Sequence, residues 1–66
     1  MKNYNALAHA IATAMSHDRP LELTLTDGRS LTGRIERREA TRQGLLITVE
    51  GHDPVRLTDV DAARWA

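Results

Sequence analysis

Four arginines lie within nine residues near the middle of the chain, close enough together to bind phosphate. The candidate RNA-binding residues are these arginines and the glutamine that follows the last of them: Arg34, Arg37, Arg38, Arg42 and Gln43. Guanidinium groups bind phosphate oxygens bidentately, so the cluster fits a nucleic-acid backbone. The alternative is that Glu36, Glu39 and Glu50 neutralise the arginines across neighbouring strands and leave a solvated charged face. The sequence leaves both interpretations open.

The composition limits what this cluster could do. Nine basic and nine acidic side chains give a net charge of zero, so any attraction to nucleic acid must come from the local patch. Tyr4 and Trp65 are the only aromatic residues, whereas proteins that bind single strands usually stack bases on several rings. We expect Trp65 to fill the core.

No pattern in the chain predicts catalysis, a metal site or a cofactor. Cysteine is absent, and His9, His17 and His52 do not pair with other ligands at a helical or hairpin spacing. No serine or threonine has an obvious neighbouring histidine base, and there is no glycine-rich phosphate loop. We therefore expect a binding protein that is not an enzyme and needs no cofactor.

The arginine cluster begins on a predicted β-hairpin. Residues 21–25 alternate leucine with polar residues, which is the period of a strand with one buried face. Asp27 and Gly28 supply the positive backbone angles of a tight turn. The second strand runs on to residue 37 or 38, and its alternation places Arg34 and Arg38 on the outer face.

Gly33 lies where this second strand should carry an inward side chain. A glycine there predicts that the strand bends sharply and that another strand passes close to it. Such a bend allows a small sheet to curl into a barrel.

Three more strands are predicted after a polar loop at residues 39–44. The first covers residues 45–49, with Leu46 facing away from the core, and the second is a short strand at residues 55–57. After an inward Val60, the last strand occupies residues 61–65, and we expect its Ala63 and Trp65 to face the core.

An amphipathic helix is predicted before the strands, from about residue 3 to residue 16. Asn3 can cap its N-terminus, and Pro20 prevents it from continuing. Its apolar stripe consists of Tyr4, Leu7, Ala8, Ile11 and Met15. We expect the helix to lie across the open end or one side of the barrel.

Together these elements predict a mostly β fold with one N-terminal helix, in which five strongly bent antiparallel strands form a small barrel. One domain is expected over residues 1–66, with the barrel from about residue 20 to 66. No apolar run is long enough to span a membrane, so we expect no membrane association and a cytoplasmic location. A barrel this small has exposed sheet edges, which favours a homo-oligomer.

Two segments resemble the Sm-like small barrels. One is Leu-Thr-Leu-Thr-Asp-Gly-Arg-Ser-Leu-Thr-Gly-Arg-Ile at residues 23–35, and the other is Val-Arg-Leu-Thr-Asp-Val at residues 55–60. Similar arrangements occur in Sm and LSm proteins, in the RNA chaperone Hfq, in the C-terminal domain of RimP and in the Rho inhibitor Rof. The resemblance implies a five-stranded Sm-like or SH3-like barrel and covers mainly core and turn positions, so it says more about fold than about function.

Two functions from different classes are compatible with this resemblance. The first is an Sm-like RNA-binding module that acts as a homo-oligomer in RNA metabolism, although residues 39–43 lack the methionine and asparagine with which Sm proteins hold a base. The alternative is a Rof-like protein-binding regulator of transcription termination, or a self-assembling adaptor. An oligomer or partner interface would then use Leu46, Val55 and Leu57.

Overall fold

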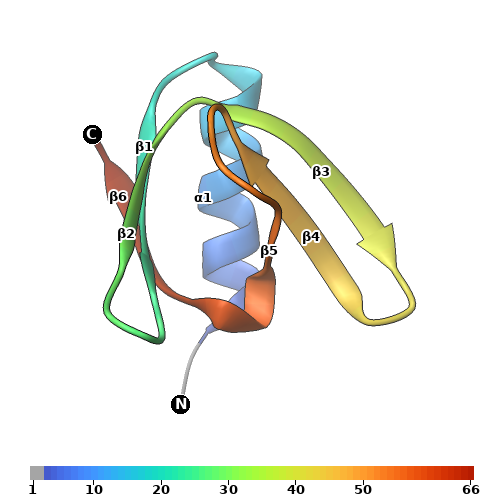
Figure 1. The fold of residues 1–66 in the computed structure, drawn as a ribbon. Helices are drawn as coiled ribbons and strands as arrows, with labels where there is room; N and C mark the ends of the chain where they lie inside the picture. The colour runs from blue at the N-terminus through green and yellow to red at the C-terminus, as the bar shows by residue number, and fades with distance from the viewer. Residues whose placement is uncertain (1–2) are drawn as a thin grey trace.

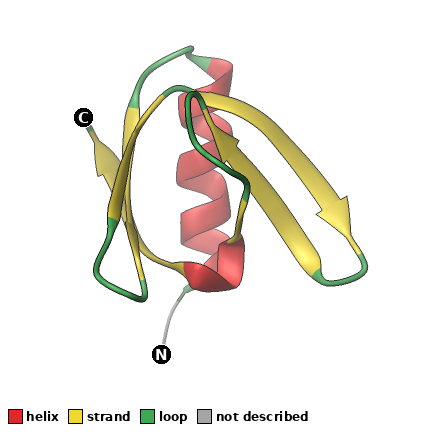
Figure 2. Ribbon diagram, in the orientation of Figure 1, coloured by secondary structure: helices red, strands yellow, loops and turns green. Residues whose placement is uncertain are grey.

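The computed structural model describes residues 3–66, which form one helix followed by six short strands (Figure 1). In chain order the elements are α1 (Tyr4–Ser16), β1 (Leu21–Leu25), β2 (Ser30–Gly33), β3 (Ile35–Thr41), β4 (Gly44–Val49), β5 (Val55–Arg56), the single 3-10 turn η1 (Leu57–Asp59) and β6 (Val60–Trp65). The predicted class, mostly β with one N-terminal helix, is confirmed (Figure 2).

The helix begins and ends where its capping residues predict. The Asn3 Oδ1 accepts a hydrogen bond from the Ala6 N–H at 3.1 Å, as expected of an N-cap. At the other end the Arg19 N–H donates to the Ala14 carbonyl at 3.0 Å, directly before Pro20.

The buried stripe of α1 differs from the predicted one. Ile11 and Ala14 are fully buried, whereas Tyr4 is 40% and Met15 37% exposed. The sheets contact the side of the helix that carries the small Ala14, because a short side chain there lets the helix backbone lie close to them. The prediction that Tyr4 and Met15 belong to the core stripe is therefore wrong.

The six strands within residues 3–66 form two separate antiparallel sheets with the orders β2-β1-β6 and β3-β4-β5, rather than the single five-stranded barrel that was predicted. Only Arg34 separates β2 from β3, so the single strand predicted here is divided between the two sheets. The turn η1 makes the second connection, between β5 and β6. Helix α1 covers one side of the space between the sheets, while the β3 and β4 ribbons extend beyond it (Figure 1).

Gly33 marks the corner between the sheets, as the sequence predicted. Its φ is +157°, and a Cβ added to it would lie 3.1 Å from Val49 Cγ1 and 3.4 Å from the Glu50 carbonyl oxygen. Next to it the Glu50 N–H donates to the Arg34 carbonyl at 2.9 Å. The second sheet thus passes directly against the end of β2.

The core lies between the two sheets and α1. It consists of ten buried residues, Ile11, Ala14, Leu21, Leu23, Leu25, Leu31, Ile35, Ile47, Val49 and Val60. All of the strand residues in this group were predicted to face inward. No polar or charged side chain among residues 3–66 is buried.

Three local predictions are wrong. Residues 39–41 belong to β3, so the expected loop at residues 39–44 shrinks to a turn at Arg42 and Gln43. In the first hairpin only Gly28 has a positive φ, +92°, and Asp27 does not. Trp65 is 45% exposed because it lies at the end of β6, where the core has already ended.

Among the described residues 3–66, no helix is long and apolar enough to cross a membrane.

We expect Gly33→Val to destabilise the fold, because its Cβ would crowd Val49 Cγ1 at 3.1 Å and leave little room for the rest of the side chain beside the Glu50 carbonyl. Overpacking of this kind costs about 1–3 kcal/mol. Each kcal/mol lowers the melting temperature of so small a domain by about 4–8 °C. Thr32→Val is the matched control, since it places the same side chain on an exposed position of the same strand. Equal melting temperatures for the two variants would show that the corner has room for a side chain.

Candidate nucleic-acid interface

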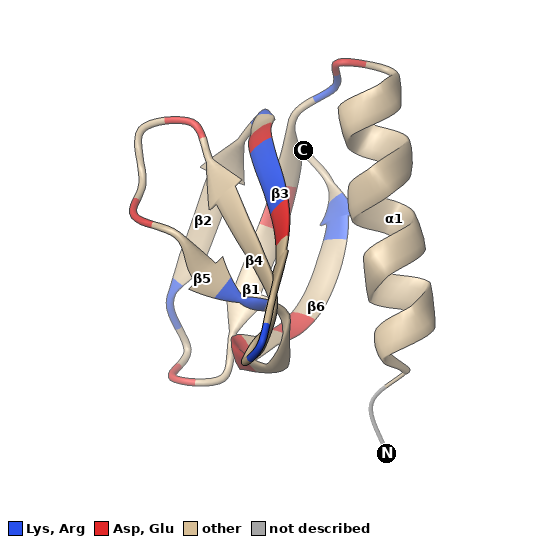
Figure 3. Ribbon diagram, turned by 90° about the vertical axis from the view of Figure 1, so that its right-hand side faces the viewer, with Lys and Arg blue, Asp and Glu red and all other residues tan. Residues whose placement is uncertain are grey.

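The outer part of the β3–β4 hairpin, residues 36–46, carries most of the arginine cluster and is called the arm below. Residues 36–40 and 42–44 are all exposed, so neither face of the arm is covered along most of its length. The main-chain ladder holds it together, with Glu39 opposite Leu46 and Thr41 opposite Gly44. In Figure 3, blue arginine segments lie on β3 and in the turn at its end, and red acidic segments lie beside those of β3.

A β-bulge at Glu36 decides which way the arginines face. The register runs from Ile35 opposite Val49 to Arg37 opposite Thr48, so the ladder skips one residue of β3. Opposed residues of an antiparallel pair share a face. Arg38, opposite Ile47, therefore lies on the core-side face of the sheet, and Arg37 lies on the outer face. The prediction that strict alternation puts Arg38 on the outer face is wrong.

Two of the four clustered arginines are held by ion pairs. The Arg34 Nε donates to the Asp18 carbonyl at 3.1 Å and lies 3.3 Å from the Asp18 Oδ1. The Arg37 Nη2 lies 3.6 Å from Glu39 Oε1. This second pair lies along one strand rather than across strands, because the two residues are neighbours on the same face of β3.

Arg38 and Arg42 form no ion pair with any residue in the range 3–66. Glu36 and Glu50, which would neutralise the cluster in the alternative interpretation, also form none within that range. Both arginines are exposed, Arg38 on the arm and Arg42 in the turn at its tip. Their guanidinium groups are thus available to an external anion.

Gln43 completes the turn of the arm beside Arg42. Its N–H donates to Thr41 Oγ1 at 3.2 Å, and the Thr41 hydroxyl donates to the Gly44 carbonyl at 2.7 Å. These bonds engage the Gln43 main chain, and its side chain is exposed at the tip. The structure therefore brings Gln43 next to Arg42, whereas Arg38 lies farther down β3, opposite Ile47.

The three candidate interface residues do not form one surface. Leu46 is half-buried and lies opposite Arg56, on the face of β4 away from the core. Val55 and Leu57 are also half-buried, but they pack against the core.

An exposed ring lies elsewhere on the molecule, at the end of β6. The Arg19 guanidinium carbon lies 4.5 Å from the centre of the Trp65 ring, a cation–π contact. Sequence reasoning missed this pair because it assigned Trp65 to the core.

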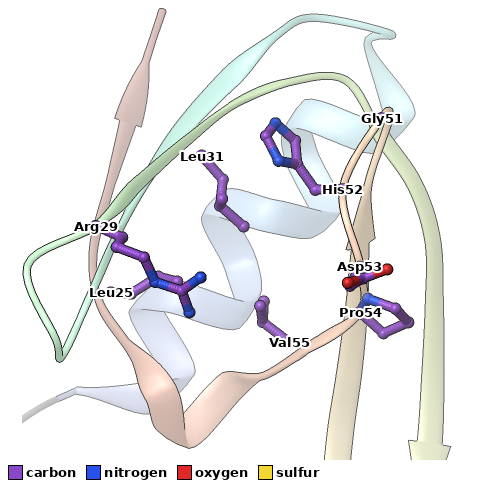
Figure 4. Close-up of a pocket in the computed structure, with 8 residues that line it drawn as sticks. All are labelled: Leu25, Arg29, Leu31, Gly51, His52, Asp53, Pro54 and Val55. Atoms are coloured by element: carbon purple, nitrogen blue, oxygen red, sulfur yellow. The ribbon is translucent and has the colours of Figure 1, made fainter.

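A pocket of about 360 Å³ lies between β2 and the loop from β4 to β5 (Figure 4). Its lining residues are Leu25, Arg29, Leu31, Gly51, His52, Asp53, Pro54 and Val55. Within residues 3–66, no three histidine, aspartate or glutamate side chains are grouped as metal ligands would be. Sequence reasoning gave no signal for this pocket.

Arg29, on the rim of the pocket, is anchored by Asp27. The Arg29 main-chain N–H donates to Asp27 Oδ1 at 3.0 Å, and the Arg29 Nε donates to Asp27 Oδ2 at 2.7 Å. These two hydrogen bonds, the main-chain one first, hold the pKa of the Asp27 carboxyl below its ordinary value of 3.8.

Comparison with known proteins gives no relative for this chain: no protein family, no curated protein and no solved structure matches it.

The lowered pKa of Asp27 predicts that the first hairpin turn contributes to the stability of the fold in a pH-dependent way. A carboxyl whose pKa is lowered by folding stabilises the fold at neutral pH and loses this effect as the pH falls below about 4. In a carbon-detected NMR titration we expect the Asp27 carboxyl to have its midpoint below 3.8. Arg29→Ala should raise that midpoint only part of the way, because the main-chain N–H remains.

The control variant is Arg64→Ala, which removes a guanidinium paired with Glu22 instead. It should leave the Asp27 midpoint unchanged. A midpoint that Arg29→Ala does not move would contradict the proposed cause.

Proposed function

We propose that this chain is an RNA-binding module of the cytoplasm, built on an Sm-like small barrel and acting as a homo-oligomer rather than as an enzyme. The observation that supports it most is the arm, where Arg38 and Arg42 are exposed without an ion pair inside residues 3–66. The arm also carries Glu36 without an ion pair in that range, so two unpaired cations and one unpaired carboxylate leave it with an excess of one positive charge in a chain of zero net charge. Phosphate binding needs such a local excess of positive charge.

The strand order supports the Sm-like part of the proposal. If β2 and β3 are counted as one bent strand, five strands follow one helix, as in the barrel that the sequence resembles. The bent strand pairs with β1 in one sheet and with β4 in the other. The turn η1 then passes the chain back to β6, which pairs with β1.

The geometry of the arm favours contact with an RNA backbone rather than with particular bases. Arg38 and Arg42 are four residues apart along an extended hairpin, about 13 Å at the usual strand rise. No aromatic residue lies on the arm, and the Trp65 ring is already in contact with Arg19. Binding of this kind is electrostatic and tolerant of sequence.

A homo-oligomer would repeat the arm around a symmetric assembly and multiply its few cations. We therefore expect a solution mass above that of the 7.4 kDa chain. Light scattering at high micromolar concentration measures this directly. A monomeric mass under these conditions would contradict the proposed homo-oligomer. It would not bear on RNA binding by the arm, which the arginine variants below test.

A protein-binding regulator is the second candidate, and Leu46 favours it. This leucine, the last residue of the arm, lies half-buried on the outer face of β4, opposite Arg56. An apolar side chain among charged residues is suited to a protein contact. Such a regulator would show no affinity for oligo-U, oligo-A or mixed RNA.

The arm proposal predicts that Arg38→Gln combined with Arg42→Gln weakens RNA binding and its salt dependence. Each phosphate contact to a single strand contributes about 0.7 to the slope of log K against log salt, so losing two contacts lowers the slope by about 1.4. Fluorescence anisotropy of labelled oligo-U over a salt series measures both quantities.

The matched control is Arg29→Gln combined with Arg64→Gln. It removes the same total charge from residues that are paired with Asp27 and Glu22 away from the arm. We expect it to retain most of the affinity and of the slope. If both double variants weakened binding equally, the arm would not be the RNA site.

A further inference from the structure

The main chain of β2 has one side without a neighbouring strand. The Leu25 N–H donates to the Arg29 carbonyl at 2.7 Å, so Arg29 directs its main-chain carbonyl toward β1. Alternate residues of a strand direct these groups to opposite sides, and Ser30 and Thr32 therefore direct theirs away from β1. Arg34 has the same parity, and its carbonyl accepts from the Glu50 N–H on that far side at 2.9 Å.

The pairing between β2 and the second sheet stops after this single bond. Beyond Glu50 the chain turns at Gly51, where φ is +83°, and passes through residues 52–54 to β5. Within residues 3–66, no main-chain hydrogen bond reaches Ser30 or Thr32 from the side of the second sheet. The pocket of about 360 Å³ lies between β2 and this loop. We call this gap the seam.

The seam lacks the features that keep exposed edges from pairing. Natural sheets protect their edges with charges, bulges and proline. The edge strand β3 has both a bulge and four charged residues, whereas β2 reads Ser-Leu-Thr-Gly and has neither. Among these two edges, only β2 is open to an added strand.

The side chains around the seam define what would fit there. Leu25, Leu31 and Val55 provide apolar contacts, and in Figure 4 the Arg29 and His52 side chains point into the pocket. Arg29 is bound to Asp27 through its Nε, so its two terminal nitrogens remain available as donors. Asp53 lines the loop side of the same pocket, and Asp27 already pairs with Arg29. An occupant would therefore complement this lining with an apolar side chain and with a carboxylate placed on the Arg29 side, away from Asp53.

We propose that the seam binds an extended peptide segment of a partner protein, which adds a strand to β2. Its main chain bonds to Ser30 and Thr32, an apolar side chain contacts Leu25, Leu31 and Val55, and an acidic side chain pairs with Arg29. This is strand addition to an open sheet edge. It uses a different surface from the arm and does not depend on RNA binding.

Hydrogen exchange of the free protein tests the geometry on which the proposal rests. The Leu31 amide, bonded to β1, should exchange slowly, whereas the Ser30 and Thr32 amides should exchange fast. Protection of Ser30 and Thr32 in the free protein at low micromolar concentration would overturn the proposal. So would protection that appears only as the protein concentration rises, because the occupant would then be a second copy.

Peptide titration tests the occupant. The probes are two acetylated and amidated pentapeptides, Thr-Val-Thr-Val-Glu and Thr-Val-Thr-Val-Gln, followed by ¹⁵N NMR up to millimolar concentration. We expect shifts at Ser30, Thr32 and the pocket residues, slower exchange of the Ser30 and Thr32 amides, and about threefold tighter binding of the acidic peptide. Absence of binding by both peptides, or shifts confined to the arm, would overturn the proposal.

Thr32→Pro removes the N–H that points into the seam without breaking the ladder to β1. It should weaken the acidic peptide about fivefold or more, because one main-chain hydrogen bond is lost. Thr32→Val keeps this N–H and should bind as the parent does. Equal binding by both variants, with both shown by melting to be folded, would overturn the proposal. The proposal would also be overturned if oligo-U, rather than the peptides, shifted the NMR signals of the seam amides.

Discussion

The close approach at Gly33 is the constraint on which the rest of the structure depends. A Cβ at this position would lie 3.1 Å from Val49 Cγ1, so a glycine lets the second sheet reach the end of β2 without displacing the Val49 side chain. Here the chain leaves one sheet and enters the other, and the Arg34 carbonyl accepts from Glu50 at 2.9 Å. The ten buried side chains of two small sheets and a helix can then share one core. In so short a chain neither sheet has enough apolar surface to be stable alone.

The sequence predicts the strands that contribute to the core and fails where a strand extends beyond it. Leu21, Leu23 and Leu25 alternate because one face of β1 is buried, and this burial leaves a readable period. Residues 36–40 of β3 are exposed on both faces, so no apolar period marks where the strand ends, and residues 39–41 were predicted as part of a polar loop. Their pairing with β4 comes from the main chain, which carries no sequence signal. The bulge at Glu36 also has no sequence signal, yet it reverses the faces of all residues that follow it on β3.

The candidate site was predictable in its residues and not in its contacts. Arg38 and Arg42 are close in sequence and remain close on the arm, because a hairpin keeps neighbours together. The partner of Arg34 is Asp18, which precedes it by 16 residues and meets it only because α1 ends beside the corner at Gly33. The exposure of Trp65 likewise depends on where the core ends rather than on residue type. The seam exists because main-chain pairing between β2 and the second sheet stops after the bond from Glu50 to Arg34, and no side-chain pattern in the sequence predicts where such pairing stops.

The arm and the seam both contain an edge strand that lacks a neighbouring strand on one side within residues 3–66. The two edges differ in how open they are to an added strand. The edge of β3 carries charges and a bulge, which disfavour an added strand, so under our proposal RNA would contact only its side chains. The edge of β2 is uncharged and turns its main chain toward a pocket with an arginine at its rim. A polyanion needs cations and no fixed register, so it suits the first edge; an extended peptide needs main-chain partners in register, so it suits the second. Because β2 and β3 meet at the Gly33 corner and belong to different sheets, the two edges can be occupied without competing for the same hydrogen-bonding groups.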